Sequence, residues 1–387
     1  MPAESPIIRS FDARAPREQL DDLRRRLRST RWPDSPGDAG WSLGTDPRFL
    51  KELVAYWIDE FDWPAAEQRL ARLPRFTTKI DGLGIHFVHA RAADAGRRVL
   101  PIILNHGWPD SFWRYTKVVE LLTDPGAHGA DPADAFDVVV PDIPGFGYSD
   151  HPSPALNSRQ VAAVFARLMS TLGYDRFVTA GGDIGSHVSR YLALDFADRV
   201  RAVHRMDAGL PAYDGDVSQL SPAERAWFEA VAAWNQAEGA YGAIQRTKPE
   251  TIAAALNDSP VGLAAWIVEK LQSWSDGDIG SVYTKDEILT DVMIFWLTQS
   301  IGSSMRMYNA NAALPREQLT RRVEVPSGFS IFAGDIVRPP REWIERTANA
   351  VRITEPERGG HFAPFEQPEL YARELRDFFR PFRDAAM

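Results

Sequence analysis

The chain has 387 residues, 44% of them hydrophobic and 25% charged, which is typical of a globular protein with one large core plus an insertion or a smaller second domain. Its net charge of −9 argues against nucleic acid or an anionic membrane as the main partner, because both favour a basic surface. The absence of cysteine excludes disulfides, thiolate catalysis and cysteine-ligated metal sites.

The sequence shows no targeting or membrane signal. Residues 1–6 lack the basic and apolar segments of a secretory signal, and no apolar run approaches the ~18 residues of a membrane span. We therefore expect a cytoplasmic protein without an integral membrane span. The oligomeric state stays open, a homodimer included.

The N-terminal part combines helical and strand patterns. Residues 16–29 place leucines at helical spacing, and amphipathic stretches follow at about 47–60 and 64–73. Residues 76–90 predict two strands joined by an Asp-Gly dipeptide, which is a hairpin signal. We assign these elements to an N-terminal domain, residues 1–95.

Strands then alternate with helical patterns. Residues 99–105 and 138–140 are apolar runs typical of buried strands, and the alternation predicts a mostly parallel sheet. We assign residues 96–207 to the first part of an α/β core.

The alternation stops near residue 208. Residues 221–300 are helical in pattern and rich in tryptophan, and strand character returns at 329–333 and 351–353. A helical block that interrupts a βα series predicts a cap, residues 208–312, inserted before the second part of the core, residues 313–387.

Residues 177–186 carry the most informative motif. A β-prone run, a small residue, a reactive residue, a second small residue and a helical pattern form the strand–turn–helix that exposes the nucleophile of an α/β-hydrolase. Asp183 stands where serine is usual. An aspartate suits attack on saturated carbon, giving an alkyl ester that water cleaves at the carboxyl carbon. This predicts an epoxide or an alkyl halide as substrate.

An acid and a histidine follow in the order that α/β-hydrolases require. Asp335 comes after the returning strand, and His361 lies in a glycine-rich loop before the last helix. Asp183 is ionised at neutral pH if its pKa is ordinary. His361, at the ordinary pKa of an imidazole, would deprotonate water in the second step, and Asp335 would orient its ring. The alternative is an inactivated serine hydrolase.

Backbone amides complete this predicted site. The loop after the first core strand and the residue after the nucleophile select the N–H groups of Trp108 and Ile184, which would stabilise negative charge on an Asp183 oxygen. We expect His106 to brace this loop, and His187, one helical turn after Asp183, to point into packing.

Together these motifs resemble those of the microsomal-type epoxide hydrolases over nearly the whole chain. Residues 61–64 and 76–87 resemble the N-terminal signature of that family, residues 106–109 its oxyanion motif and residues 181–183 its nucleophile motif. The resemblance implies an α/β-hydrolase fold with a mostly parallel sheet, a helical cap inserted after a core strand, and an N-terminal extension packed on the core. It also implies hydrolysis of an epoxide to a vicinal diol with neither cofactor nor metal.

The family polarises the epoxide oxygen with two cap tyrosines. Tyr308 matches one of them and Tyr241 matches the other less closely, with Tyr283 in reserve. A phenol is protonated at neutral pH, so it can donate to an oxygen that becomes an alkoxide. By spacing alone, a half-buried packing position is the better interpretation of each tyrosine.

Four residues depart from the family pattern. Ile184 replaces a tryptophan, Asp110 a glycine at the expected pocket rim, Ala310 a glutamate, and Asp335 a frequent glutamate. Each leaves the catalytic groups in place, so we expect them to affect the substrate range rather than the reaction.

Two other functions fit part of the pattern. A haloalkane dehalogenase shares the aspartate nucleophile but commonly binds the halide with a tryptophan where Ile184 stands. A small-molecule receptor on a hydrolase fold would need no base to activate water, so the complete set of Asp183, Asp335 and His361 argues against that function. We expect a small epoxide and water as partners, in detoxification or natural-product biosynthesis.

Overall fold

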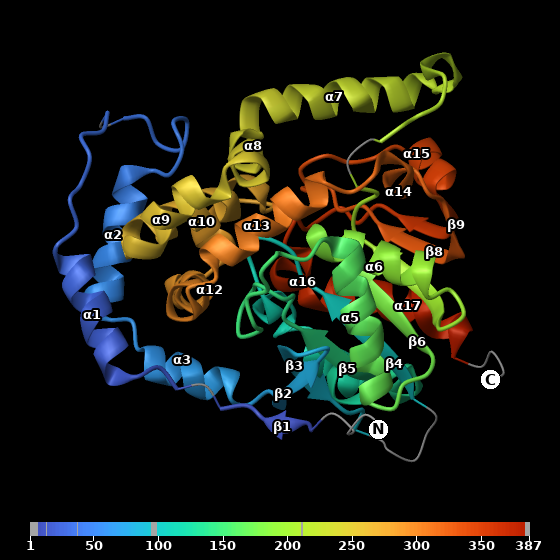
Figure 1. Ribbon diagram of the computed structural model, residues 1–387, viewed down its shortest axis with the longest axis horizontal. Coiled ribbons are helices and arrows are strands. Elements are labelled where there is room, and N and C mark those ends of the chain that lie inside the picture. The colour runs from blue at the N-terminus through green and yellow to red at the C-terminus, as the bar shows by residue number, and fades with distance from the viewer. Residues whose placement is uncertain (1–6, 13, 37, 94–98, 210–211, 384–387) are drawn as a thin grey trace.

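A twisted sheet forms the centre of the molecule. The computed structural model describes residues 7–383 except 13, 37, 94–98 and 210–211 (Figure 1). Within these residues nine strands pair in the order β1-β2-β3-β5-β4-β6-β7-β8-β9. Their bounds are β1 (Arg9–Ser10), β2 (Arg75–Ile80), β3 (Leu83–Ala90), β4 (Leu100–Asn105), β5 (Phe136–Pro141), β6 (Phe177–Gly181), β7 (Val200–Arg205), β8 (Val323–Ser330) and β9 (Ala348–Thr354).

The sheet is parallel from β5 to β9 and antiparallel at its N-terminal edge. The predicted hairpin is confirmed as β2 and β3, joined at Asp81 and Gly82 with φ of 51° and 85°. A two-residue turn with positive φ at both positions matches the twist of the flanking strands. The N-terminal segment thereby extends the core sheet.

Two helical layers cover the sheet. On one face α5 (Ser158–Thr171) packs beside α6 (Ile184–Asp195), and on the other α4 (Val119–Thr123) packs beside α17 (Pro368–Phe379). The strands between them are almost continuously apolar, as in β5, where every residue is buried. This pattern is expected of a parallel sheet covered on both faces. The core also contains α14 (Arg316–Leu319), α15 (Arg341–Thr347) and α16 (Ala363–Glu366).

A helical cap is inserted between β7 and β8 (Figure 1). Its helices are α7 (Pro222–Glu238), α8 (Ala240–Thr247), α9 (Pro249–Asp258), α10 (Pro260–Trp274), α11 (Ile279–Val282), α12 (Lys285–Thr298) and α13 (Ile301–Ala312). Side-chain caps at Ser221 and Thr284 begin α7 and α12, each with a glutamate three residues later.

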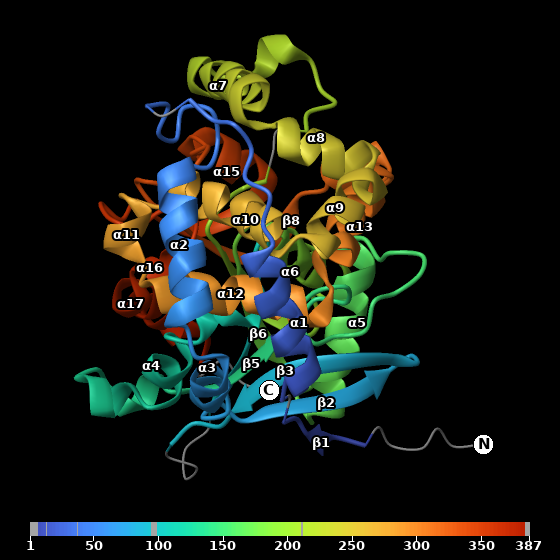
Figure 2. The same ribbon diagram turned by 90° about the vertical axis from the view of Figure 1, so that its left-hand side faces the viewer.

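The N-terminal helices lie against the cap. These are α1 (Arg17–Arg28), α2 (Pro47–Asp59) and α3 (Trp63–Leu70), and Figure 2 shows α1 and α2 in front of the cap helices. Helices α1 and α2 contact α10, and α2 and α3 contact α12. The N-terminal segment thus joins the core through its strands and the cap through its helices.

Some sequence expectations need adjustment. The strand predicted at 329–333 ends at Ser330, because the chain leaves the sheet to place the loop that carries Asp335. The domain boundaries stay predictions, and the one at 95/96 lies outside the described residues.

Among the described residues, no single helix is long and apolar enough to cross a membrane. Helices α9 and α10 together have the required length and composition, but the pair is bent by 117°.

Candidate active site

Asp183 lies at a sharp turn between β6 and α6. Its φ of 56° and ψ of −132° are strained for a residue with a side chain, and this turn raises the carboxylate above the sheet. The turn requires close backbone contact, since a Cβ on Gly185 would come within 1.9 Å of the carbonyl oxygen of Asn105. A Cβ on Gly181 would in turn lie 2.4 Å from the carbonyl oxygen of Gly185, so glycine two residues before and after Asp183 is a steric requirement of the turn.

The predicted acid and histidine meet Asp183 at the ends of the parallel strands. The Nδ1 atom of His361 lies 2.9 Å from Oδ1 of Asp335, and its Nε2 atom lies 3.4 Å from Oδ2 of Asp183. The His361 side chain is 6% exposed, so both contacts lie away from bulk water. The loop is held to the cap because the His361 amide donates to the carbonyl of Trp274 at 2.8 Å.

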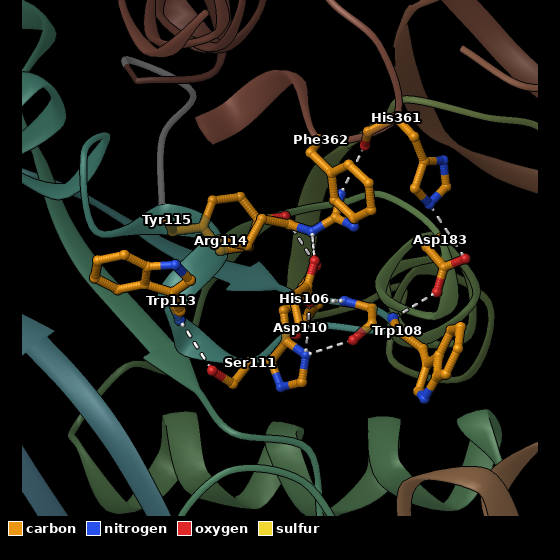
Figure 3. A network of polar contacts seen from close by, with 12 residues as sticks. His106, Trp108, Asp110, Ser111, Trp113, Arg114, Tyr115, Asp183, His361 and Phe362 are labelled. Atoms are coloured by element: carbon orange, nitrogen blue, oxygen red, sulfur yellow. Dashed lines mark hydrogen bonds and ion pairs between the residues drawn. The ribbon is translucent and has the colours of Figure 1, made fainter. Parts of the chain in front are cut away.

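The predicted backbone donors lie at the Asp183 carboxylate. The Trp108 amide donates to Oδ1 at 2.8 Å, and the adjacent Ile184 amide helps to lower the pKa of the carboxylate. Oδ1 is thus held by the Trp108 amide while Oδ2 faces His361 (Figure 3). The two oxygens of the carboxylate have different surroundings.

The pKa of His361 differs from the ordinary imidazole value that the sequence led us to expect. Burial alone would lower the pKa of His361, but the carboxylates of Asp335 and Asp183 at its two nitrogens raise it to about 10. Burial would raise the pKa of Asp183, but His361, the Arg114 guanidinium and the Ile184 amide lower it to about 2. Asp183 is therefore ionised, as expected, whereas His361 is protonated at neutral pH.

A buried arginine that the sequence did not indicate links the loops of the site. Arg114 donates from Nε to Asp110 and from Nη1 to the carbonyl of His361 at 2.9 Å (Figure 3). Asp110 in turn accepts from the amide of Gly107, beside the oxyanion amide of Trp108. Asp110 was expected at the pocket rim, but it is only 4% exposed, because it pairs with Arg114 beneath the site.

His106 braces this loop as expected. Its Nε2 accepts from the amide of Ile143 at 3.0 Å, and its ring is fully buried next to Asp142 and Asp110. It has no direct access to the substrate side of Asp183. The prediction that His106 is not the base therefore agrees with its position.

The two predicted cap tyrosines lie together above the nucleophile. The ring centroids of Tyr241, on α8, and Tyr308, on α13, are 6.2 Å apart, and both rings contact the Trp108 indole. Burial is the main reason that both tyrosine pKa values are raised, and the Asp183 charge adds to it. Both phenols therefore stay protonated and can donate.

Tyr283 lies elsewhere. Its hydroxyl is 2.9 Å from Ser275 Oγ, and its ring stacks on Phe365. The structure thus separates the reserve tyrosine from Asp183.

These groups share one cavity of about 280 Å³ between core and cap. Asp183, Asp335, His361, Tyr241 and Tyr308 all line it. Its remaining walls are largely apolar and include Ile184, Trp227, Trp234, Ile336 and Val337. A larger groove of about 610 Å³, near Trp296 between α1 and the cap, contains none of the predicted site residues.

Three more residues were missed or misplaced. Glu366 accepts from the amides of Gly360 and Phe362 and so braces the loop of His361, and Asp207 accepts from the Asp183 amide at 3.1 Å. His187 was expected in packing, but its ring lines the cavity. A position one helical turn from the nucleophile does not settle which way a ring points, so no sequence signal could have placed it.

Known proteins resemble this chain over almost its whole length. Residues 8–115 match the family model described as the epoxide hydrolase N terminus, and residues 101–335 match that of the alpha/beta hydrolase fold. A relative from Stigmatella aurantiaca is 41% identical, covering 97% of this chain and 86% of its own. Epoxide hydrolase 1 of Sus scrofa is 33% identical, covering 97% and 89%. The Aspergillus niger epoxide hydrolase structure superposes with a TM-score of 0.86 at 32% identity, covering 97% of both chains.

Proposed function

Because the chain belongs to the epoxide hydrolase family and has the α/β-hydrolase fold, we propose that it converts an epoxide into a vicinal diol through an ester on Asp183. The observation that carries this mechanism is the ionised Asp183 carboxylate, which shares a cavity with two protonated tyrosines. Relatives named as epoxide hydrolases favour this reaction over halide release or a receptor role.

The first step forms the ester. Oδ2 of Asp183 attacks an epoxide carbon, since Oδ1 is occupied by the Trp108 amide. The carbon–oxygen bond of the ring breaks, and its electron pair stays on the oxygen. Tyr241 and Tyr308 donate hydrogen bonds to that oxygen, and one phenol supplies the proton that makes it a hydroxyl.

The second step cleaves the ester. His361 removes a proton from water, and the hydroxide adds to the carboxyl carbon of Asp183. The Trp108 amide stabilises the charge that develops on Oδ1, and we assign the Ile184 amide the role of second donor. The intermediate then expels the diol oxygen, which takes the proton from His361. One oxygen of the water remains in Asp183, first as a carboxylic acid, whose proton returns to His361 and restores the carboxylate and the protonated imidazole.

The raised pKa of His361 links the two steps. Ester formation removes the Asp183 charge, one of the two negative charges that hold the imidazole protonated. The pKa of His361 then falls, and the proton it releases replaces the one that the phenol gave to the substrate. Proton uptake and release balance, and the base becomes active only after the ester exists.

We assign Arg114 a positioning role. Its hydrogen bonds hold the His361 carbonyl and, through Asp110, the loop with the oxyanion amide of Trp108. One cation therefore fixes the distance between the base and the oxyanion amides. A cytoplasmic location, a homodimeric state and a detoxifying or biosynthetic role stay predictions from the sequence.

A labelling experiment tests the covalent mechanism. In a single turnover in ¹⁸O-water with enzyme in excess over an epoxide, the label should enter the Asp183 carboxylate and not the first diol. Mass spectrometry of the peptide that contains Asp183 measures it. Label in the first diol would refute an ester intermediate, and Asp183→Ala should abolish turnover.

A further inference from the structure

A buried lysine lies against one of the two cap tyrosines. Lys270 is on the cap helix α10, and its side chain is only 6% exposed. Its Nζ atom lies over the ring of Tyr241, 4.7 Å from the ring centroid, and 5.6 Å from the ring centroid of Trp274. The ring of Tyr241 also stacks on the indole of Trp108, with 13° between the two planes. Two indoles and one ammonium therefore hold the Tyr241 ring in place.

The ammonium is paired with a neighbouring carboxylate, as a buried lysine requires. Nζ forms an ion pair with Glu269, whose side chain is 21% exposed and accepts a hydrogen bond from Ser273. The charge of this carboxylate opposes the ammonium, because it adds to the burial and the Asp183 charge that raise the pKa of Tyr241. Water screens the more exposed carboxylate more strongly than the buried ammonium, so the cation has the larger effect at the ring.

A cation over a phenol ring matters most when the phenol loses its proton. In the proposed first step one phenol gives its proton to the opening epoxide, and the negative charge left on the phenol oxygen spreads into the ring. A cation over the ring face attracts this charged ring more strongly than it attracts the neutral phenol. An interaction that is stronger in the transition state than in the ground state accelerates the step. Lys270 therefore favours proton transfer from the ring over which it lies.

The two cap tyrosines differ in this support. The ammonium lies over Tyr241, and within the described residues no cation lies over the ring of Tyr308. Burial is the main reason that both pKa values are raised, but the neighbouring phenol lowers the pKa of Tyr241 and raises that of Tyr308. Both differences favour a negative charge on Tyr241 over one on Tyr308.

We propose that Lys270 is a positioning residue of the first step: it holds the ring of Tyr241 and stabilises the negative charge that this ring gains, so that Tyr241 gives its proton to the epoxide oxygen. The proton leaves the Tyr241 oxygen as the carbon–oxygen bond of the epoxide breaks. Tyr308 keeps its proton and donates a hydrogen bond to the same epoxide oxygen. The proton that His361 releases after ester formation then restores the phenol. This inference rests on the proposed function, since it assigns a proton that the proposed first step requires.

Single-turnover kinetics with styrene oxide test the inference, since this apolar epoxide matches the largely apolar walls of the cavity. Rapid quenching and intact-protein mass spectrometry measure the fraction of enzyme that carries one added substrate, and so give the rates of ester formation and ester hydrolysis. Lys270→Met keeps the length of the side chain without its charge and should slow ester formation about tenfold, the size of a desolvated cation–π interaction. The rate of ester hydrolysis should stay that of the wild type. Lys270→Arg keeps a cation that stacks on aromatic rings and should restore most of the rate of ester formation.

A second lysine over a tyrosine ring provides the matched control. Lys285 has its Nζ atom 5.3 Å from the ring centroid of Tyr56, and neither residue lines the cavity. Lys285→Met makes the same chemical change at the same kind of contact, so it should leave both rates unchanged. A tenfold slower ester formation in this variant would show that the loss of any such lysine has this effect.

The decisive comparison adds Tyr241→Phe. If Lys270 acts through the Tyr241 proton, Lys270→Met should slow ester formation little further once that phenol is removed. A loss that stays about tenfold in the Tyr241→Phe background would overturn the inference. So would a loss that falls equally on ester hydrolysis, because Lys270 would then act by packing on Trp274, whose carbonyl holds the loop of His361.

The remaining outcomes separate the inference from the proposed function. If Lys270→Met fails to fold because Glu269 is left without its cation, the double variant Glu269→Gln with Lys270→Met removes both charges. This double variant should form the ester more slowly than Glu269→Gln alone, and equal rates would overturn the role of Lys270. An absence of any Asp183 ester in the wild type would instead count against the proposed function.

Discussion

The charge of Arg114 offers a quantitative test of how the site is held together. Its side chain is 0% exposed and pairs with Asp110, which is 6% exposed. In Arg114→Met the apolar chain keeps much of the volume, but Asp110 becomes a buried carboxylate without its cation. Breaking a buried pair in this way costs about 3–5 kcal/mol of the free energy of unfolding. Part of that loss is the charged hydrogen bond to the carbonyl of His361, roughly 1.5–3 kcal/mol.

The double variant Asp110→Asn with Arg114→Met isolates the stranded charge. The asparagine oxygen can still accept from the Gly107 amide, but no unpaired charge remains. Replacing both partners of a buried pair is often nearly neutral, so we expect the double variant to recover to within about 2 kcal/mol of the wild type. Urea unfolding followed by tryptophan fluorescence measures both variants. Equal losses in the single and double variants would refute the charge argument.

The same variants report on function. Because Arg114 holds the backbone of His361, Arg114→Met should slow hydrolysis of the ester more than its formation. Single-turnover measurements with an epoxide separate the two rates. A variant that slows both steps equally would show that Arg114 acts through general stability and not through the base.

Three further predictions concern the reacting groups. His361→Gln should form the ester but hydrolyse it slowly, so intact-protein mass spectrometry should find one added substrate, and the lack of any adduct would place His361 in the first step. Tyr308→Phe should slow ester formation by up to about 10²–10³-fold, which is the loss expected for one oxyanion donor, and the double variant with Tyr241→Phe should nearly abolish it. Stopped-flow tryptophan fluorescence follows ester formation. A double variant that forms the ester at the wild-type rate would remove the tyrosines from the mechanism. The pKa of His361 is raised to about 10, so the stability it contributes is complete below its unfolded pKa of 6.5 and is lost as the pH rises through about 10. The stability advantage of the wild type over His361→Gln should therefore shrink between about pH 7 and 10 in urea unfolding, and a constant difference would contradict the pKa.

The positions of the main site residues were accessible from the sequence because they depend on chain order. In a parallel sheet the loops after successive strands meet at one edge, so Asp183, Asp335 and His361 had to lie near one another once their strands were recognised. The position of the Trp108 amide could be predicted in the same way. Local sequence patterns and the order of the elements were enough to predict all four positions.

The remaining features depend on contacts that no local pattern encodes. Arg114 reaches the carbonyl of a residue 247 positions later, and its buried partner Asp110 looked like a rim residue. The raised pKa of His361 requires two carboxylates at known distances, which only the folded chain supplies. His187 points into the cavity because of how α6 is rotated against its neighbours, and helical spacing alone does not fix that rotation.

The bond between the amide of His361 and the carbonyl of Trp274 ties the loop that carries the proposed base to the cap. His361 belongs to the core and Trp274 to the cap, so any displacement of the cap from the core would have to break this bond. Under the proposed mechanism, ester hydrolysis would therefore require the cap to be seated on the core, because only that arrangement fixes the loop of His361.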